Sequence, residues 1–278
     1  MIKRFVFTLV FVLLISGVLF SQDSIKRKNS IQVGYGLHHL ASQDLIFSPF
    51  ILKDFTPVNF GIVYKHEDRF LHVAEVYFNS YNPVYINTFE YYTVPDSGKL
   101  ETIKNDFTHV NLNYVFAKKI KSAQQYSWYL GIMSENTIHS QYYYSGYFST
   151  FGYFASFGLS AWSQLEYRLN DKHVFNVAAH FPLTAWVARS PYLANDDEFI
   201  QNISSHNGLR TFFAYLEDGS LQTLNTLQQF DFKLHYNYVL SERWYVGTAY
   251  QFSFIHNNKP LNLINYQNGI NINSTFHF

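Results

Sequence analysis

The chain has 278 residues, with 20 basic and 20 acidic side chains, and it contains no cysteine. This charge balance gives no indication of nucleic-acid binding, and the absence of cysteine excludes a module held together by disulfides. Aromatic residues make up 20% of the chain and charged residues only 14%, which excludes a disordered chain. With a mean hydropathy of −0.12, the composition fits strands whose alternate residues face apolar and polar surroundings.

The first residues predict an export signal. Residues 1–4 include the basic Lys3 and Arg4, residues 5–20 are almost wholly apolar, and residues 21–23 are polar. A basic segment, an apolar segment and a small residue at the break are the parts of a secretory signal peptide. The apolar stretch is shorter than the roughly 20 residues that a membrane-spanning helix needs. We therefore expect residues 1–21 to be a signal peptide and residues 22–278 to form one domain.

The dominant periodicity of the remaining chain is two. Residues 229–240 carry apolar side chains at the even positions and mostly polar ones at the odd positions, and residues 155–169 repeat this pattern except at Trp162. A strand sends alternate side chains to opposite faces, so each segment has one apolar and one polar face. Ten segments are read as strands, near residues 30–40, 58–66, 69–81, 106–119, 126–142, 153–169, 172–189, 227–240, 243–256 and 266–278.

Three local features refine this reading. The segment 69–81 alternates poorly, and we expect a bulge or register shift near Ala74-Glu75. Residues 95–98 and 217–220 each resemble the tip of a hairpin that projects beyond the strands. If either hairpin entered the wall, the number of strands would rise from ten to twelve.

The links between the segments differ in length. Tight links at 66–69, 169–172 and 240–243, and a slightly longer one at 119–126, alternate with long links at 41–57, 82–105, 143–152, 190–226 and 257–265. Short turns on one side and long loops on the other are typical of outer-membrane barrels, whose short turns are periplasmic and whose long loops are extracellular. An even number of strands then places both ends of the mature chain on the periplasmic side.

The last segment carries a resemblance to a known family. Ile270, Ile272 and Phe276 share one face with the final residue, Phe278, and only Ser274 interrupts the apolar row. This pattern resembles the carboxy-terminal signal by which the barrel-assembly machinery of Gram-negative bacteria recognises its clients. Together with the signal peptide and the alternating strands, it makes the chain similar to Gram-negative outer-membrane β-barrel proteins over its whole mature length. The chain resembles no characterised functional subfamily of these proteins.

The resemblance implies an all-β fold, a transmembrane antiparallel up-and-down β-barrel of about ten strands. It further implies a monomer in the cell outer membrane, reached after signal-peptide export. Its expected partners are outer-membrane lipids and, during biogenesis, the barrel-assembly machinery, with no nucleic acid.

Polar and charged side chains gather on the face that would line the lumen: His109, Glu135, His139, Glu166, Arg168, His180, Asp231, Lys233 and His235. A barrel of about eight strands is just wide enough to be filled by side chains, and one of ten strands is little wider. We expect these residues to form a network of salt bridges and hydrogen bonds, because an unpaired buried charge is costly. The alternatives are a narrow polar pathway and a ligand cavity.

No cofactor and no metal ion is expected. His38 and His39 are neighbours in one strand and point to opposite faces, so they cannot easily share a metal. Asp196-Asp197-Glu198 lacks the ligand spacing of a calcium loop.

Three functions remain open. The first is a structural or interaction role through the loops near 82–105 and 190–226, and the second is a small channel or transporter with a polar lumen. The third is an outer-leaflet lipid hydrolase, for which Ser204-Ser205-His206 offers a hydroxyl and a base, or a protease, for which Asp196-Asp197 gives only a superficial likeness. A base serves a nucleophile only when a rigid scaffold holds the two together, and this segment lies in a loop. The sequence identifies no catalytic residue and favours a protein that is not an enzyme.

Overall fold

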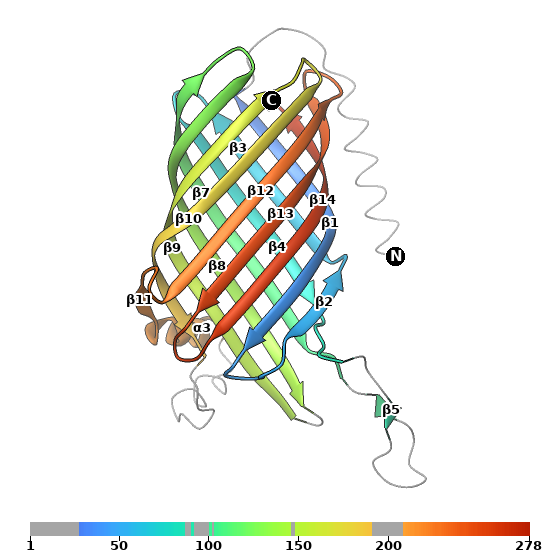
Figure 1. Ribbon diagram of the computed structural model, residues 1–278, viewed down its shortest axis with the longest axis vertical. Coiled ribbons are helices and arrows are strands. Elements are labelled where there is room, and N and C mark those ends of the chain that lie inside the picture. The colour runs from blue at the N-terminus through green and yellow to red at the C-terminus, as the bar shows by residue number, and fades with distance from the viewer. Residues whose placement is uncertain (1–27, 87–89, 92–99, 102, 146–147, 191–207) are drawn as a thin grey trace.

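The computed structural model describes residues 28–86, 90–91, 100–101, 103–145, 148–190 and 208–278. Ten antiparallel strands of this part of the chain form a closed barrel (Figure 1). The wall strands are β1 (Asn29–Asp44), β3 (Asn59–Glu67), β4 (Leu71–Tyr81), β7 (Asp106–Ser122), β8 (Tyr126–Ser145), β9 (Phe148–Arg168), β10 (His173–Arg189), β12 (Leu227–Val239), β13 (Trp244–Asn257) and β14 (Leu263–His277). The predicted fold class and the predicted number of wall strands are confirmed, whereas the predicted signal peptide lies outside the described residues.

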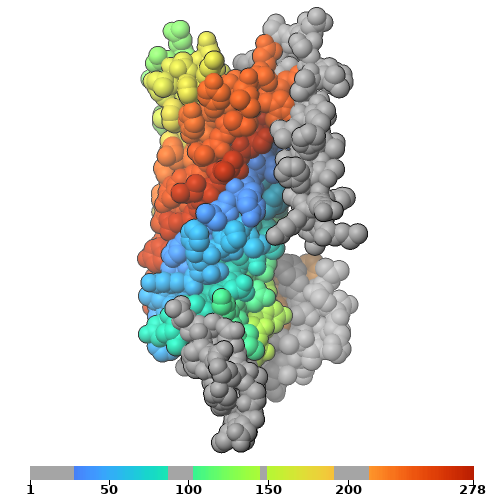
Figure 2. Space-filling view, turned by 90° about the vertical axis from the view of Figure 1, so that its right-hand side faces the viewer, coloured from blue at the N-terminus to red at the C-terminus, as the bar shows by residue number. Residues whose placement is uncertain are grey.

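The barrel closes where the last strand meets the first. Each wall strand pairs with the next along the chain, and β14 pairs with β1, so the blue and red bands lie side by side in Figure 2. The Asn29 amide donates to the Phe278 carbonyl at 3.2 Å, and the Phe278 amide donates to the Asn29 carbonyl at 2.9 Å. A closed barrel leaves no unpaired sheet edge, which is a requirement for a wall surrounded by lipid.

Alternation along the strands gives the wall two chemically different surfaces. On β14, Ile270 and Ile272 point outward and are 62% and 72% exposed, whereas Asn271 and Asn273 point inward and are 3% and 4% exposed. The outer surface is therefore apolar, as lipid contact requires. The lumen holds the buried side chains, so the core of this molecule lies inside the barrel.

The two ends of the barrel differ. At one end, here called the short-turn end, residues 68–70, 123–125, 169–172 and 240–243 connect the wall strands. The other end, here called the loop end, has the long connections at 45–58, 82–105 and 190–226, although only positions 146–147 separate β8 from β9 there. The chain end at Phe278 lies with the short turns, as Figure 1 shows.

The link predicted at 143–152 is wrong in detail, because strand structure continues through it. β8 extends to Ser145 and β9 begins at Phe148. The rings of Tyr142 and Phe151 lie 5.1 Å apart, and Tyr143 stacks on Phe47 at 4.4 Å. These aromatic contacts support the extension of both strands beyond the predicted ends.

Two short strands lie outside the ring of wall strands. β2 (Leu52–Thr56) pairs with β1, and β11 (Ser220–Gln222) pairs with β10, both at the loop end. The predicted hairpin around 95–98 is present as the pair β5 (Glu90–Tyr91) and β6 (Leu100–Glu101), although its tip lies outside the described residues. None of these strands enters the wall, so the alternative of twelve wall strands is not realised.

The hairpin predicted around 217–220 is wrong. Its first arm belongs to helix α3 (Gly208–Glu217), and only the second arm is a strand, β11. Leu209, Phe212, Phe213 and Leu216 recur at intervals of three and four residues, a spacing typical of a helix that presents one apolar face. Among the residues that the structure describes, no helix is long and apolar enough to cross a membrane.

The bulge predicted near Ala74-Glu75 is also wrong. The register of β4 with both neighbours is continuous, and the irregular positions lie instead between Lys119 and Lys121 and between Pro182 and Thr184. The poor alternation of β4 has another cause, which is that Leu71 and Val73 face the lumen and are buried there.

Candidate functional site in the barrel lumen

An apolar cluster lies in the lumen near the short-turn end, and it is here called the short-turn plug. Its members are Leu71, Val73, Val115, Ala117, Tyr129, Met133 and Trp162. The rings of Tyr129 and Trp162 are only 2% and 5% exposed. Trp162, which interrupts the polar face of its strand in the sequence, therefore fills the lumen with its indole ring.

Charged side chains lie between this plug and the short-turn end. Glu67 accepts from Lys119 at 2.7 Å and lies 3.3 Å from Lys65. Glu166 lies 3.1 Å from Arg168 and 3.9 Å from Lys65. Glu166 and Arg168 were predicted to belong to one lumen network, but they lie in this separate cluster, where the Arg168 side chain is 58% exposed.

Two further apolar clusters, together called the loop-end plug, lie in the lumen near the loop end. Its members are Leu40, Leu52, Tyr81, Phe107, Tyr143, Phe154, Ala185, Val187, Leu227, Ile255 and Leu263. Among them, the rings of Tyr81, Phe107 and Phe154 are at most 1% exposed. Within the described chain, apolar side chains therefore occupy the lumen on both sides of its polar centre.

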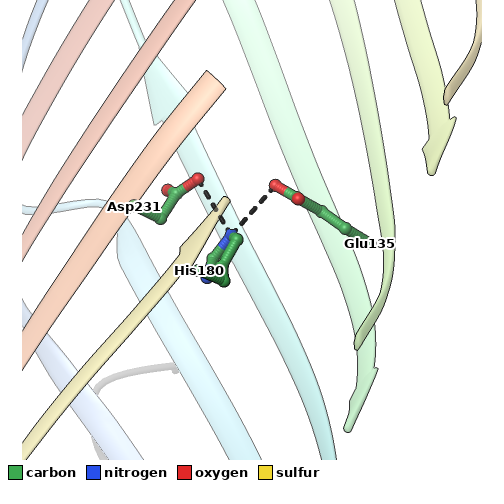
Figure 3. A group of neighbouring side chains, drawn as sticks. All are labelled: Glu135, His180 and Asp231. Carbon is green, nitrogen blue, oxygen red and sulfur yellow. Dashed lines mark ion pairs between the residues drawn. The ribbon is translucent and has the colours of Figure 1, made fainter. Parts of the chain in front are cut away.

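Three side chains from different strands meet at that centre, as Figure 3 shows. Nε2 of His180 on β10 lies 3.1 Å from Oε1 of Glu135 on β8 and 3.1 Å from Oδ2 of Asp231 on β12. The His180 side chain is 6% exposed, and its ring nitrogen lies between the two carboxylates without aligning a hydrogen bond to either. All three residues were predicted to lie on the lumen face, and the structure brings them together.

Neighbouring polar groups hold Glu135 in place. The Ser160 hydroxyl donates to Oε2 of Glu135 at 2.6 Å, and the Gln229 side-chain amide donates to Oε1. Both oxygens of this carboxylate therefore have a donor before His180 is counted. Such contacts fix the orientation of a buried carboxylate and lower the cost of burying it.

An ion pair lies beside this group. Nζ of Lys233 on β12 is 2.5 Å from Oε2 of Glu75 on β4 and 3.3 Å from the Tyr77 hydroxyl. The Asn113 side-chain amide also donates to Glu75, at 3.4 Å. His235, another predicted lumen residue, follows Lys233 on the same face of β12 and is partly buried.

The remaining two predicted lumen residues form a pair toward the loop end. The rings of His109 and His139 stack with centroids 3.6 Å apart and planes 14° apart, and both residues are at most 1% exposed. Gln267 lies 3.2 Å from Nδ1 of His109. These histidines contact each other rather than the carboxylates, so the predicted network is divided into separate groups along the barrel axis.

Several charged residues of the lumen were not predicted from the sequence. Glu75 was obscured by the poor alternation of its strand, and Lys65 and Glu67 were close to a predicted turn. Asp44 and Arg189 lay at or beyond the ends of their predicted segments. The alternation of each strand could have identified them, because each lies an even number of residues from other inward-facing residues of its strand.

A cavity of about 50 Å³ lies at the polar centre, and Tyr77, Glu135, His180, Asp231 and Lys233 contribute to its lining. A polar cavity needs only about 10–15 Å³ to hold a water molecule, so this one has room for a few. It is much smaller than the roughly 300 Å³ of a typical site for an organic ligand. The centre therefore suits water or a small ion.

Some candidate residues lie outside the described part of the chain. These are the possible nucleophile and base at Ser204-Ser205-His206 and the acidic group Asp196-Asp197-Glu198. Within β1, His38 is buried inside the lumen and His39 is not, because adjacent residues of a strand point to opposite faces.

Comparison with family models and with curated proteins finds no match. Solved structures do match. The outer membrane protease OmpT from Escherichia coli aligns with a TM-score of 0.50 and 7% identity, covering 94% of this chain and 99% of that chain. The Pseudomonas putida toluene transporter TodX gives 0.33 and 10% identity, covering 93% and 90%. The attachment invasion locus protein Ail of Yersinia pestis gives 0.28 and 6% identity, covering 90% and 99%.

The closed ring of ten antiparallel strands, the apolar outer surface and the likeness to OmpT define the class of fold as an outer-membrane β-barrel. At 7% identity the likeness to the protease concerns the fold alone.

Proposed function

We propose that this chain is a non-conducting outer-membrane barrel that acts as a rigid support for binding at its loop end. The observation that supports the proposal is the pair of plugs, which place buried apolar side chains in the lumen on both sides of a cavity of about 50 Å³. A conducting porin instead keeps a water-filled lumen through the membrane.

Location in the outer membrane is part of the proposal. It is supported by the barrel fold, by the predicted export signal at residues 1–21 and by the aromatic residue Phe278 at the end of the last strand. In this orientation the short turns face the periplasm and the loop end faces the outside.

The loop end has features of a binding surface. β2 is paired with the wall strand β1, and near it Phe50 and Tyr85 stack with ring centroids 4.2 Å apart while remaining 49% and 57% exposed. Ile51 and Ile86 beside them in sequence are 48% and 58% exposed. Aromatic and aliphatic side chains held outward on a rigid scaffold are typical of the residues that contribute most to binding.

Conductance across a planar lipid bilayer tests the proposal. The refolded wild-type protein is expected to give no stable current steps. A variant with Tyr129→Ala, Trp162→Ala, Tyr81→Ala and Phe107→Ala, which removes rings from both plugs, is expected to conduct. Variants with only one plug truncated are expected to stay silent, because the other plug still blocks the lumen.

The controls separate a closed lumen from a failed insertion. Every preparation is first shown to migrate faster on a gel when unboiled, as an assembled barrel does. Stable current steps from the wild-type protein at the frequency of the opened variant would refute the proposal and favour the channel alternative.

A further inference from the structure

We propose that Glu135, His180 and Asp231 bind a divalent transition-metal ion at the centre of the lumen. Glu135 lies on β8, His180 on β10 and Asp231 on β12, so the ion would join strands that are not all neighbours in the sheet. This inference is independent of whether the barrel conducts and of what its loop end binds.

The distances fit a shared ion. One donor atom from each residue lies within 4.8 Å of the other two, and the His180 Nε2 atom is 3.1 Å from each carboxylate oxygen. A metal with bonds of about 2.0–2.2 Å to nitrogen and oxygen places neighbouring ligand atoms about 3.0–3.5 Å apart. The side chains are therefore already near the separation that coordination requires.

His180 provides an observation independent of the two carboxylates. Its side chain is 6% exposed, and Nε2 has no aligned hydrogen bond although it points between Glu135 and Asp231 (Figure 3). Two carboxylates that face one buried ring nitrogen at 3.1 Å need a positive charge between them, because unneutralised carboxylates are costly to bury. A metal ion supplies that charge, because a neutral imidazole coordinates through the lone pair of this nitrogen.

The charges of the polar centre also favour a cation. Glu75, Glu135 and Asp231 contribute three carboxylates, and Lys233 contributes one ammonium group, which is occupied by Glu75 at 2.5 Å. With a neutral His180, two negative charges remain uncompensated in a closed space. One divalent ion would balance them, and its binding would relieve the repulsion between Glu135 and Asp231.

The surroundings resemble the outer shell of a metal site. The Ser160 hydroxyl donates to the Glu135 oxygen that does not face His180, at 2.6 Å. Such contacts orient ligands and tune their basicity. The adjoining cavity of about 50 Å³ can hold the water molecules that would complete the coordination.

The donor set selects the class of ion. One imidazole nitrogen and two carboxylate oxygens suit Zn²⁺, Mn²⁺ or Co²⁺, whereas Ca²⁺ prefers six to eight oxygen ligands. Zn²⁺ is the first ion to test because it accepts three protein ligands with water in the fourth position. Co²⁺ serves as its spectroscopic substitute.

The experiment measures metal bound to the refolded barrel. The mature chain, made without a polyhistidine tag, is refolded into detergent with Zn²⁺, passed through a desalting column and analysed for zinc by mass spectrometry. The wild-type protein is expected to retain one equivalent, and His180→Gln less than a tenth of that. The matched control is His235→Gln, which removes another lumen histidine from the neighbouring strand and is expected to retain one equivalent.

Refolding with Co²⁺ adds a direct readout of the ligands. The wild-type protein is expected to show visible d–d absorption that is absent from His180→Gln and from Glu135→Gln. Gel mobility of unboiled samples shows which variants are folded, and Glu135→Gln serves if His180→Gln fails to fold. A folded wild-type protein that retains no zinc, or zinc retained equally by all variants, would overturn the proposal and leave a protonated His180 paired with two carboxylates.

Discussion

Arg189 on β10 and Asp44 on β1 form an ion pair across the loop end of the lumen, with Nη2 and Oδ1 2.6 Å apart and both side chains 2% exposed. Three wall strands separate β10 from β1 in the sheet, so this contact spans the interior rather than following the wall. Nη1 of Arg189 also donates to the carbonyl of Lys259 at 3.0 Å and to the carbonyl of Leu261. The pair therefore lies across the lumen beside the loop-end plug and holds the link between β13 and β14.

Loss of one partner of this pair is expected to destabilise the barrel strongly. Arg189→Met leaves Asp44 buried without its counter-charge, which costs about 3–5 kcal/mol. The double variant Arg189→Met with Asp44→Leu removes both charges and is expected to recover at least half of that loss. Urea unfolding in lipid vesicles, followed by tryptophan fluorescence, measures the free energy of unfolding.

A matched exposed pair provides the control. Lys28 and Asp68 lie 2.8 Å apart, but their side chains are 52% and 61% exposed. Solvent screens such a pair, so Lys28→Met is expected to leave the free energy of unfolding nearly unchanged. Equal losses for Lys28→Met and Arg189→Met would show that burial of the Arg189 pair has no special importance.

Gly269 is expected to be required for space beside His38. The two residues face each other in the register of β1 and β14, and a Cβ atom at Gly269 would lie 2.1 Å from Nε2 of His38. Gly269→Ala should therefore cost about 1–3 kcal/mol through overpacking. In a His38→Ala background the same substitution should cost much less, and a double-mutant cycle on unfolding free energies measures the difference. Equal costs in both backgrounds would mean that the clash is not with His38.

Helix α3 is expected to depend on one stacked pair for its position. Tyr215 stacks on Tyr153 of β9 with ring centroids 4.3 Å apart and planes 10° apart, and the Trp186 indole donates to the carbonyl of Leu216 at 3.0 Å. Tyr215→Ala should increase the rate of proteolysis at 208–217 at least fivefold while leaving the unboiled gel mobility of the barrel unchanged. Leu221→Ala, at a position that is 69% exposed, is the control and should not change the cleavage rate. An unchanged rate for Tyr215→Ala would show that other contacts hold the helix.

Phe278 is expected to act during assembly more than in the finished structure. Its backbone pairs with Asn29, but its side chain is 48% exposed on the outer face. Phe278→Ala should lower the fraction of heat-modifiable protein in the outer membrane several-fold, whereas its unfolding free energy after refolding in vitro should change by less than about 1 kcal/mol. A large loss of stability in vitro with normal assembly in cells would contradict the predicted role as an assembly signal.

The wall could be predicted from the sequence because lipid and lumen impose the same two-residue period on every strand. The segment read at 227–240 is β12 (Leu227–Val239), and the one read at 172–189 is β10 (His173–Arg189). Each wall strand meets apolar surroundings on one face, so the pattern is repeated ten times and individual errors have little effect.

The loop end could not be predicted in the same way. The extension of β8 and β9 and the docking of α3 depend on contacts between residues far apart in sequence, such as Tyr153 with Tyr215. The helical spacing within 208–217 was present in the sequence, but the turn residues at 217–220 favoured a hairpin. Tertiary packing decided between two locally acceptable structures.

For the lumen, the sequence indicates which residues face inward but not at which height they lie. Glu135, His180 and Asp231 were all assigned to the polar face, yet their meeting depends on strand tilt and register. Glu75 was missed because the apolar Leu71 on the same face of β4 belongs to a plug, which gives the inward surface both polar and apolar layers.

A lumen closed at both ends is expected to protect a thiol placed at its centre from reagents in solution. The chain has no cysteine, so Thr137→Cys introduces a single thiol at a position that lines the cavity and is 3% exposed. Gln124→Cys, in an exposed short turn, is the matched control. With a charged methanethiosulfonate reagent on the folded barrel, the thiol at position 137 is expected to react at least a hundredfold more slowly than the one at position 124, and both should react alike after unfolding. Rapid reaction at position 137 in the folded barrel would show that the lumen is open to solutes and would contradict a lumen closed at both ends.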